Sequence, residues 1–217
     1  MSFTIEQRSD AVDAILQQAP VLPVLAIKQL DDALPLARAL INGGLPVLEI
    51  TLRTDCALAA IEQIASELPQ AVVGAGTVLD AAQLAAVAEA GGRFAISPGA
   101  TAAVYAAAAV SEIPLIPAIA TASELMAGME QGHRRFKFFP AESSGGVAAL
   151  KSFAGPFAGI GFCPTGGIGP TSAPSYLALP NVTTVGGSWM VPADTVAARD
   201  WDRIEALARE AVALVRG

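Results

Sequence analysis

The sequence contains few of the residues that metal sites and disulfide frameworks require. Its 217 residues include two cysteines, Cys56 and Cys163, and a single histidine, His133. Two cysteines so far apart have neither the count nor the spacing of a disulfide framework or a zinc site, so we expect two reduced thiols. One isolated histidine does not provide the usual histidine-containing metal cluster, which argues against metal-dependent catalysis.

Long apolar runs and clusters of basic residues are also missing. Proline, glycine or a charged residue interrupts each apolar run well before the ~18 residues that suggest a membrane span, and residues 1–19 lack the layout of a signal peptide. The net charge is −7 without a basic stripe, which argues against nucleic-acid binding. We therefore expect a soluble, cytoplasmic protein that binds neither membranes nor nucleic acid, and in which local groups bind any anionic ligand.

What the chain does contain is apolar sequence in a regular pattern. Hydrophobic residues make up 53% of the chain, enough for one sizeable core, so we predict a single domain over residues 1–217. Eight short apolar runs start at intervals of roughly 20–25 residues, which leaves room for a strand, a loop and a short helix. The runs cover residues 21–28, 46–52, 71–78, 93–99, 114–120, 135–141, 159–167 and 181–189.

The stretches between these runs have apolar residues at helical spacing. Residues 30–44 end in glycines, and the stretches that begin at Asp55 and Asp80 open with an aspartate suited to cap a helix. Residues 4–19 begin with a Thr4/Gln7 capping box and predict an extra helix that could plug the bottom of a barrel. Residues 202–217 predict the last helix.

Strand followed by helix, eight times, is the pattern of an α/β fold, the (β/α)8 or TIM barrel. The chief alternative is an open doubly wound sheet. However, no G-x-G-x-x-G motif opens a helix near the start of the chain, and units of nearly even length favour closure. We predict a barrel with an extra N-terminal helix.

Polar residues late in apolar strands are the candidates for catalysis, because the catalytic groups of such barrels gather at the carboxyl ends of the strands. Side chains alternate across a strand, so Glu49 and Arg53 in "VLEITLR" share one face, which should be the lumen or its rim. Lys137 in "RRFKFFP" has the parity opposite to Phe136 and Phe138, which are expected to pack outward against helices. The sequence therefore predicts a lysine inside the barrel.

The chain has only three lysines, and two of them have simple explanations. Lys151 lies on a helical stretch and is expected to be solvated, and Lys28 ends the first strand, where it can extend from the rim. An ordinary lysine, with a pKa of ~10.4, is neutral in only about 4 of 10,000 molecules at pH 7. Burial can lower the pKa of a lysine by ~3 units, which makes about a quarter neutral and able to add to a ketone as a Schiff base.

Glu49 is a plausible general acid and base for such a reaction, since it also faces the lumen. A charged Glu49 favours the ammonium form of Lys137, so its effect opposes that of burial. Spacing alone leaves a purely structural Lys137–Glu49 ion pair equally open.

Two glycine pairs suggest a phosphate site. "CPTGGIG" and "VGGSW" lie at the ends of the seventh and eighth predicted strands, where these barrels often bind phosphate through backbone N–H groups and a short helix. We predict a cradle of Gly166, Gly167, Gly187 and Ser188. Gly-Gly pairs also occur simply as tight turns.

Four further residues have weaker signals. His133 precedes the sixth strand, so we expect it on the surface at the face away from the site. Glu142 is as consistent with capping a loop as with a role in the site. Thr77 and Thr165 end strands three and seven, where a hydroxyl could orient substrate, although each alone is more typical of a turn or a cap.

Six motifs occur in this order over nearly the whole chain: "VLEITLRT", "GAGTVLD", "FAISPG", "FKFFPAE", "FCPTGGI" and "GGSWMVPAD". Together they resemble the class I aldolases of the KDPG/4-hydroxy-2-oxoglutarate family, where KDPG is 2-dehydro-3-deoxy-6-phosphogluconate. The resemblance implies cleavage of KDPG to pyruvate and glyceraldehyde 3-phosphate in the Entner–Doudoroff pathway. It also implies a (β/α)8 barrel, a homotrimer, and neither a metal nor an organic cofactor.

The same resemblance implies a role for each matching residue, with no departure at these positions. Lys137 would form the Schiff base and Glu49 would be the general acid and base, partly through water. The residues that would contact substrate are Arg53 and Thr77 at its carboxylate, Pro98 and Phe139 as walls, Thr165 at the reacting hydroxyl, and Gly166, Gly167 and Ser188 at the phosphate.

Two alternatives to this reading remain. The enzyme could prefer the galactonate epimer or 4-hydroxy-2-oxoglutarate, and decarboxylation of oxaloacetate is a further side activity of such a site. From a different class, the chain could be a catalytically silent barrel that binds phosphosugars. Such a barrel would use the glycine cradle but would not need Lys137 beside Glu49.

Overall fold

The structure, a computed structural model, describes residues 4–214 and is a (β/α)8 barrel, as the sequence predicts. The strands run parallel to one another in the order β7-β6-β5-β4-β3-β2-β1-β8, and isolated bridges such as Thr165 to Gly186 bring β8 beside β7, which closes the ring. The alternative of an open doubly wound sheet is wrong. The strands are β1 (Val21–Leu25), β2 (Val47–Thr51), β3 (Val72–Gly76), β4 (Ala95–Ser97), β5 (Leu115–Ile119), β6 (Arg135–Phe138), β7 (Gly161–Pro164) and β8 (Val185–Gly187).

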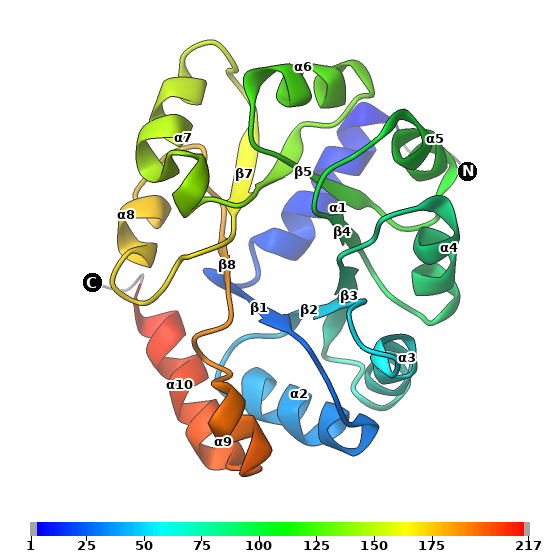
Figure 1. Ribbon diagram of the computed structural model, residues 1–217, viewed down its shortest axis with the longest axis vertical. Helices are drawn as coiled ribbons and strands as arrows, with labels where there is room; N and C mark the ends of the chain where they lie inside the picture. Colours follow the sequence, from blue (N-terminus) through cyan, green and yellow to red (C-terminus); the bar gives the residue numbers. More distant parts are fainter. Residues whose placement is uncertain (1–3, 215–217) are drawn as a thin grey trace.

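Most helices surround the strands on the outside of the barrel, as Figure 1 shows, and the first helix lies across one end. Each predicted apolar run contains one strand, and helices fill the stretches between them. The helices are α1 (Ile5–Leu16), α2 (Ala33–Asn42), α3 (Ala57–Glu67), α4 (Ala81–Glu89), α5 (Ala102–Val110), α6 (Ala122–Glu130), α7 (Gly146–Ala154), α8 (Ala173–Leu177), α9 (Ala193–Ala197) and α10 (Trp201–Ala213), with short 3-10 turns η1 (Leu30–Asp32) and η2 (Glu142–Ser144). No helix within residues 4–214 is both long and apolar enough to cross a bilayer.

The predicted helix caps are partly confirmed. Thr4 and Gln7 form the expected capping box of α1, and the side chain of Asp80 accepts from the backbone N–H of Gln83 at the start of α4. The prediction for Asp55 is wrong. Helix α3 begins two residues later, after Cys56, whose Sγ donates to the carbonyl of Ile27 at 3.2 Å and thereby holds this turn against the loop that follows β1.

The last helix begins at Trp201, slightly earlier than predicted, because Asp200 precedes it and accepts from the backbone N–H of Arg203. Residues 215–217, which the sequence places in the same helix, lie outside the described residues.

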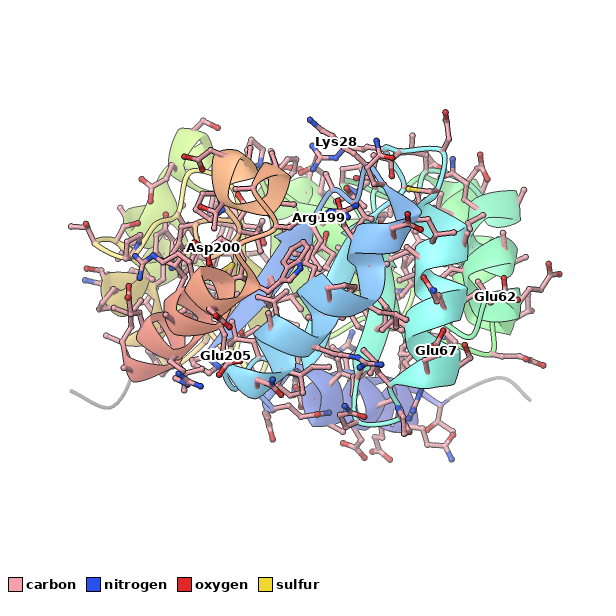
Figure 2. The ribbon with its side chains drawn as sticks, turned by 90° about the horizontal axis from the view of Figure 1, so that it is seen from below. Lys28, Glu62, Glu67, Arg199, Asp200 and Glu205 are labelled. Carbon is pink, nitrogen blue, oxygen red and sulfur yellow. The ribbon has the colours of Figure 1, made fainter. Side chains whose placement is uncertain are left out.

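Helix α1 plugs one end of the barrel. Its residues Val12, Ile15 and Leu16 are buried in one cluster with side chains of the strands and their approaches, Leu22, Val47, Phe94, Ile96, Ile116 and Cys163. Asp13 of α1 also forms a bidentate ion pair with Arg135 of β6. Nε and Nη2 of Arg135 donate to the two carboxylate oxygens of Asp13, each at 2.5 Å. Figure 2 shows α1 at the end of the barrel opposite Lys28, so the plug closes the face away from the carboxyl ends of the strands.

His133 is buried rather than on the surface, so that prediction is wrong. Only 2% of the residue is exposed, and its ring lies 5.2 Å from the ring of Tyr105 and 6.3 Å from that of Phe136. Arg8 of α1 lies over it, with Nη1 3.5 Å from Nε2. Helix α1 therefore covers the barrel at the start of β6 and shields His133 from water.

We expect the folded protein to lose stability between about pH 6.5 and pH 4 through this histidine. Burial, aided by the charges of Arg8 and Arg134, lowers the pKa of His133 from 6.5 to about 4. In that interval the unfolded chain binds a proton that the folded chain does not, so the free energy of unfolding falls as the pH falls, by up to about 3 kcal/mol.

Urea unfolding at pH 7.5 and pH 5, on the wild type and on His133→Gln, measures this effect. The variant is expected to show a smaller difference between the two pH values. Equal differences in both proteins would show that His133 does not contribute.

Candidate active site

A buried pair of opposite charges lies in the lumen of the barrel. Nζ of Lys137, on β6, donates to Oε1 of Glu49, on β2, at 2.8 Å. Only 5% of Lys137 and 1% of Glu49 are exposed. Because β2 and β6 lie on opposite sides of the ring, the two side chains meet across the lumen.

The strand alternation that the sequence predicts is what directs Lys137 inward. Phe136 packs outward onto Gly128 of α6, and the ring of Phe138 meets that of Phe153 of α7 edge to face at 6.1 Å. These phenylalanines bury the outer face of β6. Phe139 lies two residues after Lys137. Its ring centroid is 5.5 Å from Nζ of Lys137, so the ring forms an aromatic wall beside the amine.

Glu49 has one carboxylate oxygen free to react. Oε1 is bound to Lys137, whereas Oε2 is buried without a hydrogen-bond partner in the described part of the chain. A buried carboxylate oxygen without a partner is costly, so a bound molecule that offers a hydroxyl or water proton there would be favoured. The pair therefore presents an amine and, within the same chamber, a group that can take or give a proton.

The predicted carboxylate-binding residues lie around the mouth of the barrel on the β2 and β3 side. Arg53 follows β2 and is exposed, and Thr77 follows β3 directly. Thr77 has a φ of 61°, a left-handed conformation that is rare for a β-branched residue and that costs of order 1–3 kcal/mol. Pro98 follows β4 and is also exposed. Within residues 4–214 no hydrogen bond or ion pair connects these three side chains to the Lys137–Glu49 pair.

The predicted phosphate cradle lies across the mouth, at β7 and β8. Gly166 and Gly167 have φ values of 106° and 79°, and the carbonyls of Thr165 and Gly166 accept from the backbone N–H groups of residues 141 and 142. Thr165 is buried, and its Oγ1 has no partner among the described residues. The turn after β7 is thus held by backbone bonds against the loop that follows Lys137.

The two predicted cradle residues at the end of β8, Gly187 and Ser188, have different surroundings. Ser188 is exposed at the mouth. Gly187 instead makes room for the ring of Trp189, because a Cβ there would lie 2.0 Å from that ring. Ser188, directly after β8, is therefore open to the mouth, whereas Gly187 is buried.

A cavity of about 580 Å³ lies beside this mouth, at the end of β1. It contains both Arg53 and Ser188, and so it reaches from the predicted carboxylate side to the predicted phosphate side. Lys28, Asp32 and Arg199 also line it. Among the described residues, no group of three or more His, Cys, Asp or Glu side chains is arranged to hold a metal ion.

Comparison with known proteins identifies the family. The family model described as KDPG and KHG aldolase matches residues 12–207. The chain belongs to this aldolase family. The KHG/KDPG aldolase of Escherichia coli (strain K12) is 57% identical over 202 residues, which cover 93% of this chain and 95% of that protein.

Two solved aldolase structures that contain bound molecules have the same fold as this chain. A KDPG aldolase of Legionella pneumophila with pyruvate captured as a covalent carbinolamine has a TM-score of 0.91 and 48% identity, and the match covers 92% of this chain and 97% of that one. The 2-keto-3-deoxy-6-phosphogluconate aldolase of Zymomonas mobilis ZM4 with 3-phosphoglycerate has a TM-score of 0.88 and 52% identity, covering 94% and 95%.

Two glycines of this aldolase matter to the site although the sequence analysis did not single them out. A Cβ on Gly76 would lie 2.1 Å from Oε1 of Glu49, and a Cβ on Gly186 would lie 2.1 Å from Oγ1 of Thr165. Both glycines therefore make room for a predicted site residue inside the lumen. Their lumen-facing parity in "GAGTV" and "VGGSW" is the signal that could have revealed them.

Three other residues have clearer roles in the structure than in the sequence. Cys163 pairs in register with Lys137 and is fully buried, and burial raises the pKa of its thiol to about 12, so it is an inert part of the lumen floor. Thr51, on the face of Glu49, donates to the carbonyl of Leu25 at 2.8 Å and ties β2 to β1. Glu142 accepts from the hydroxyl of Tyr176 at 2.8 Å and so connects the loop after β6 to α8.

Gly76→Ala is expected to lower the kcat of the aldolase about 10- to 100-fold, because a displacement of about 1 Å in a catalytic group has effects of this size. The new methyl group would push the carboxylate of Glu49 away from Lys137. Gly155→Ala is the matched control, since a Cβ there would have nothing within 4 Å. Steady-state kinetics of both variants measure the effect, and an unchanged kcat in Gly76→Ala would show that the position of Glu49 does not limit catalysis.

Proposed function

We propose that this chain is a class I aldolase that cleaves KDPG to pyruvate and glyceraldehyde 3-phosphate through a Schiff base on Lys137. The observation that carries the proposal is the buried contact between Nζ of Lys137 and Glu49 at the mouth side of a barrel lumen. A structural ion pair would satisfy both oxygens of the carboxylate. Here Oε2 of Glu49 remains without a partner in the described chain, which suits a group that exchanges protons with a ligand.

Binding would begin at the two ends of the substrate. Arg53 offers a guanidinium that can hold the substrate carboxylate in a fixed orientation, and the hydroxyl of Thr77 would assist it. The phosphate would be bound by Gly166, Gly167, Gly187 and Ser188, through backbone N–H groups and the serine hydroxyl. Pro98 and Phe139 would form the walls between these ends.

Lys137 then adds to the C2 ketone. Glu49 takes the proton that the ammonium of Lys137 must lose before it can attack, which their 2.8 Å contact allows directly. The carbinolamine loses its hydroxyl as water with a proton from Glu49, and the result is a protonated imine. This imine attracts the electrons of the neighbouring C3–C4 bond.

Cleavage and release follow from the same two groups. Glu49 accepts the proton of the C4 hydroxyl, which Thr165 would orient, while the C3–C4 bond breaks and its electrons form an enamine. Glyceraldehyde 3-phosphate leaves, the enamine takes a proton at C3, and water hydrolyses the imine to release pyruvate and free Lys137. No electrons are gained or lost overall, and the protonated imine on Lys137 withdraws the electrons of the breaking bond, which is the task that a metal ion would perform in a metal-dependent aldolase.

We also propose that the aldolase is a cytoplasmic homotrimer, as the family resemblance implies. The exposed side chains of Leu79, Val110 and Met126 offer apolar surface for contacts between subunits, with 55%, 77% and 54% exposed. Sedimentation velocity at micromolar concentration distinguishes a trimer from a monomer.

The same site could act on three related substrates. The name of the Escherichia coli relative includes KHG, which is 4-hydroxy-2-oxoglutarate, and its cleavage would use the same enamine. Decarboxylation of oxaloacetate would use the enamine as well. The orientation of the C4 hydroxyl beside Thr165 would decide between KDPG and its galactonate epimer.

Release of pyruvate, followed with lactate dehydrogenase, tests the proposal on four substrates: KDPG, its galactonate epimer, 4-hydroxy-2-oxoglutarate and oxaloacetate. We expect KDPG to have the highest kcat/KM. Binding of KDPG without any release of pyruvate would instead identify a silent phosphosugar-binding barrel, and would refute the proposal.

A further inference from the structure

The proposed phosphate site contains hydrogen-bond donors but no positive charge. Gly166, Gly167 and Gly187 offer only backbone N–H groups, and Ser188 adds a neutral hydroxyl. The side chain packed against Gly167 is the acidic Glu142, whose Cγ lies 2.7 Å from where a Cβ on Gly167 would be. A cation elsewhere in the mouth would strengthen the binding of a phosphate that carries up to two negative charges, beyond what neutral donors provide.

Lys28 is placed to provide that cation. It is the third residue after the end of β1, so it lies in a loop at the carboxyl ends of the strands, and β1 has β8 and β2 as its neighbours in the ring. The residue is exposed, as the sequence predicts, and it lines the same cavity as Ser188. Figure 2 shows Lys28 at the end of the barrel opposite α1, which is the end where the strand termini form the site.

The other cations of the cavity have partners or roles. Arg199 is paired with Asp32, with Nε and Oδ1 2.8 Å apart, and Arg53, which follows β2, is the residue proposed to bind the substrate carboxylate. The side chain of Lys28 makes no hydrogen bond or ion pair with any residue from 4 to 214. The lining thus holds three cations against one carboxylate, in a chain whose net charge is −7, and Lys28 is the cation left for the phosphate.

We propose that Lys28 is a specificity-determining residue that binds the phosphate end of the substrate and so favours phosphorylated over non-phosphorylated substrates. This inference rests on the proposed aldolase function. Lys28 follows β1, which lies between β8 and β2 in the ring. Ser188 follows β8 directly, so the two residues lie on neighbouring loops and line the same cavity. Since a flexible, exposed ammonium acts mainly through charge, its effect belongs to binding rather than to the chemical step.

The test compares Lys28→Met with Lys151→Met. Both variants lose one positive charge and keep a side chain of similar length, but Lys151 is exposed in the last turn of α7, at the opposite end of that helix from the mouth. The substrates are KDPG and 2-dehydro-3-deoxygluconate, which differ only in the phosphate. Kinetics are measured at low and high salt, together with the pyruvate concentration that gives half-maximal trapping of the imine by borohydride.

We expect Lys28→Met to raise the KM for KDPG about tenfold at low salt, with kcat unchanged within about twofold. The effect should shrink at high salt, because salt screens exposed charges. The KM for 2-dehydro-3-deoxygluconate, the half-maximal pyruvate concentration and all parameters of Lys151→Met should stay as in the wild type. Lys28→Arg should restore most of the KDPG affinity.

Equal KM values for KDPG in Lys28→Met and Lys151→Met would overturn the inference. An equal loss with both substrates, accompanied by weaker pyruvate binding, would also overturn it, since Lys28 would then serve the carboxylate end. Failure of the aldolase function itself would look different, because the wild type would neither cleave KDPG nor form an imine with pyruvate.

Discussion

Lys137→Met is expected to lower KDPG cleavage by about 10⁴-fold or more, since the variant has no amine to form the imine and loss of a covalent nucleophile has effects of this size. Methionine keeps the length of the side chain and fits the apolar wall formed by Phe139. Lys151→Met, with its lysine on the surface of α7, is the matched control and should retain wild-type turnover. Turnover in Lys137→Met within tenfold of the control would contradict the role of Lys137.

The same substitution should also destabilise the fold, which the sequence alone did not lead us to expect. Removing Lys137 leaves the carboxylate of Glu49 buried without its hydrogen-bond partner, and breaking such a buried pair typically costs about 3–5 kcal/mol. The double variant Lys137→Met, Glu49→Gln removes both charges and should recover most of this loss. Circular dichroism and urea unfolding of the two variants separate loss of chemistry from loss of fold.

Glu49→Gln is expected to lower kcat about 10²- to 10⁴-fold, the usual contribution of general acid and base catalysis. Glutamine has nearly the same shape but cannot accept the proton of the C4 hydroxyl. Imine formation with pyruvate should remain measurable but slower, because the amine of Lys137 is still present. Each step that moves a proton through Glu49 should be slowed.

The matched control is Glu62→Gln. Glu62 is exposed on the outer side of α3, as Figure 2 shows, and its substitution changes the net charge by the same amount. Stopped-flow measurement of imine formation and steady-state cleavage are compared in both variants. Wild-type turnover in Glu49→Gln would exclude Glu49 from the mechanism.

The fold could be predicted from the sequence because local and global signals agree. Eight apolar runs at even intervals, each followed by a stretch with helical periodicity, have few ways to bury their apolar faces other than a closed parallel barrel. The Thr4 capping box and the amphipathic stretch after it also predicted the plug helix α1. What the sequence could not show was which surface that plug covers, and for this reason His133 was wrongly expected to be exposed.

For the candidate site, strand alternation predicted which side chains face the lumen but not the distances between them. Alternation along β2 and β6 placed Glu49 and Lys137 in the lumen, but the 2.8 Å contact depends on the stagger of the strands, which spacing does not give. The stagger of the strands also determines that Gly76 lies against Glu49 and Gly186 against Thr165, so the need for glycine at these two positions could not be predicted either. The cap at Asp55 failed because a tertiary bond from Cys56 to the β1 loop sets where α3 begins.

Borohydride reduction in the presence of pyruvate, followed by peptide mapping with mass spectrometry, tests the central claim most directly. The account predicts that one pyruvate-derived 1-carboxyethyl group becomes attached to Lys137 and to no other lysine, and that the protein loses KDPG cleavage in proportion to the labelling. A label on Lys28 or Lys151, or no label at all, would contradict it.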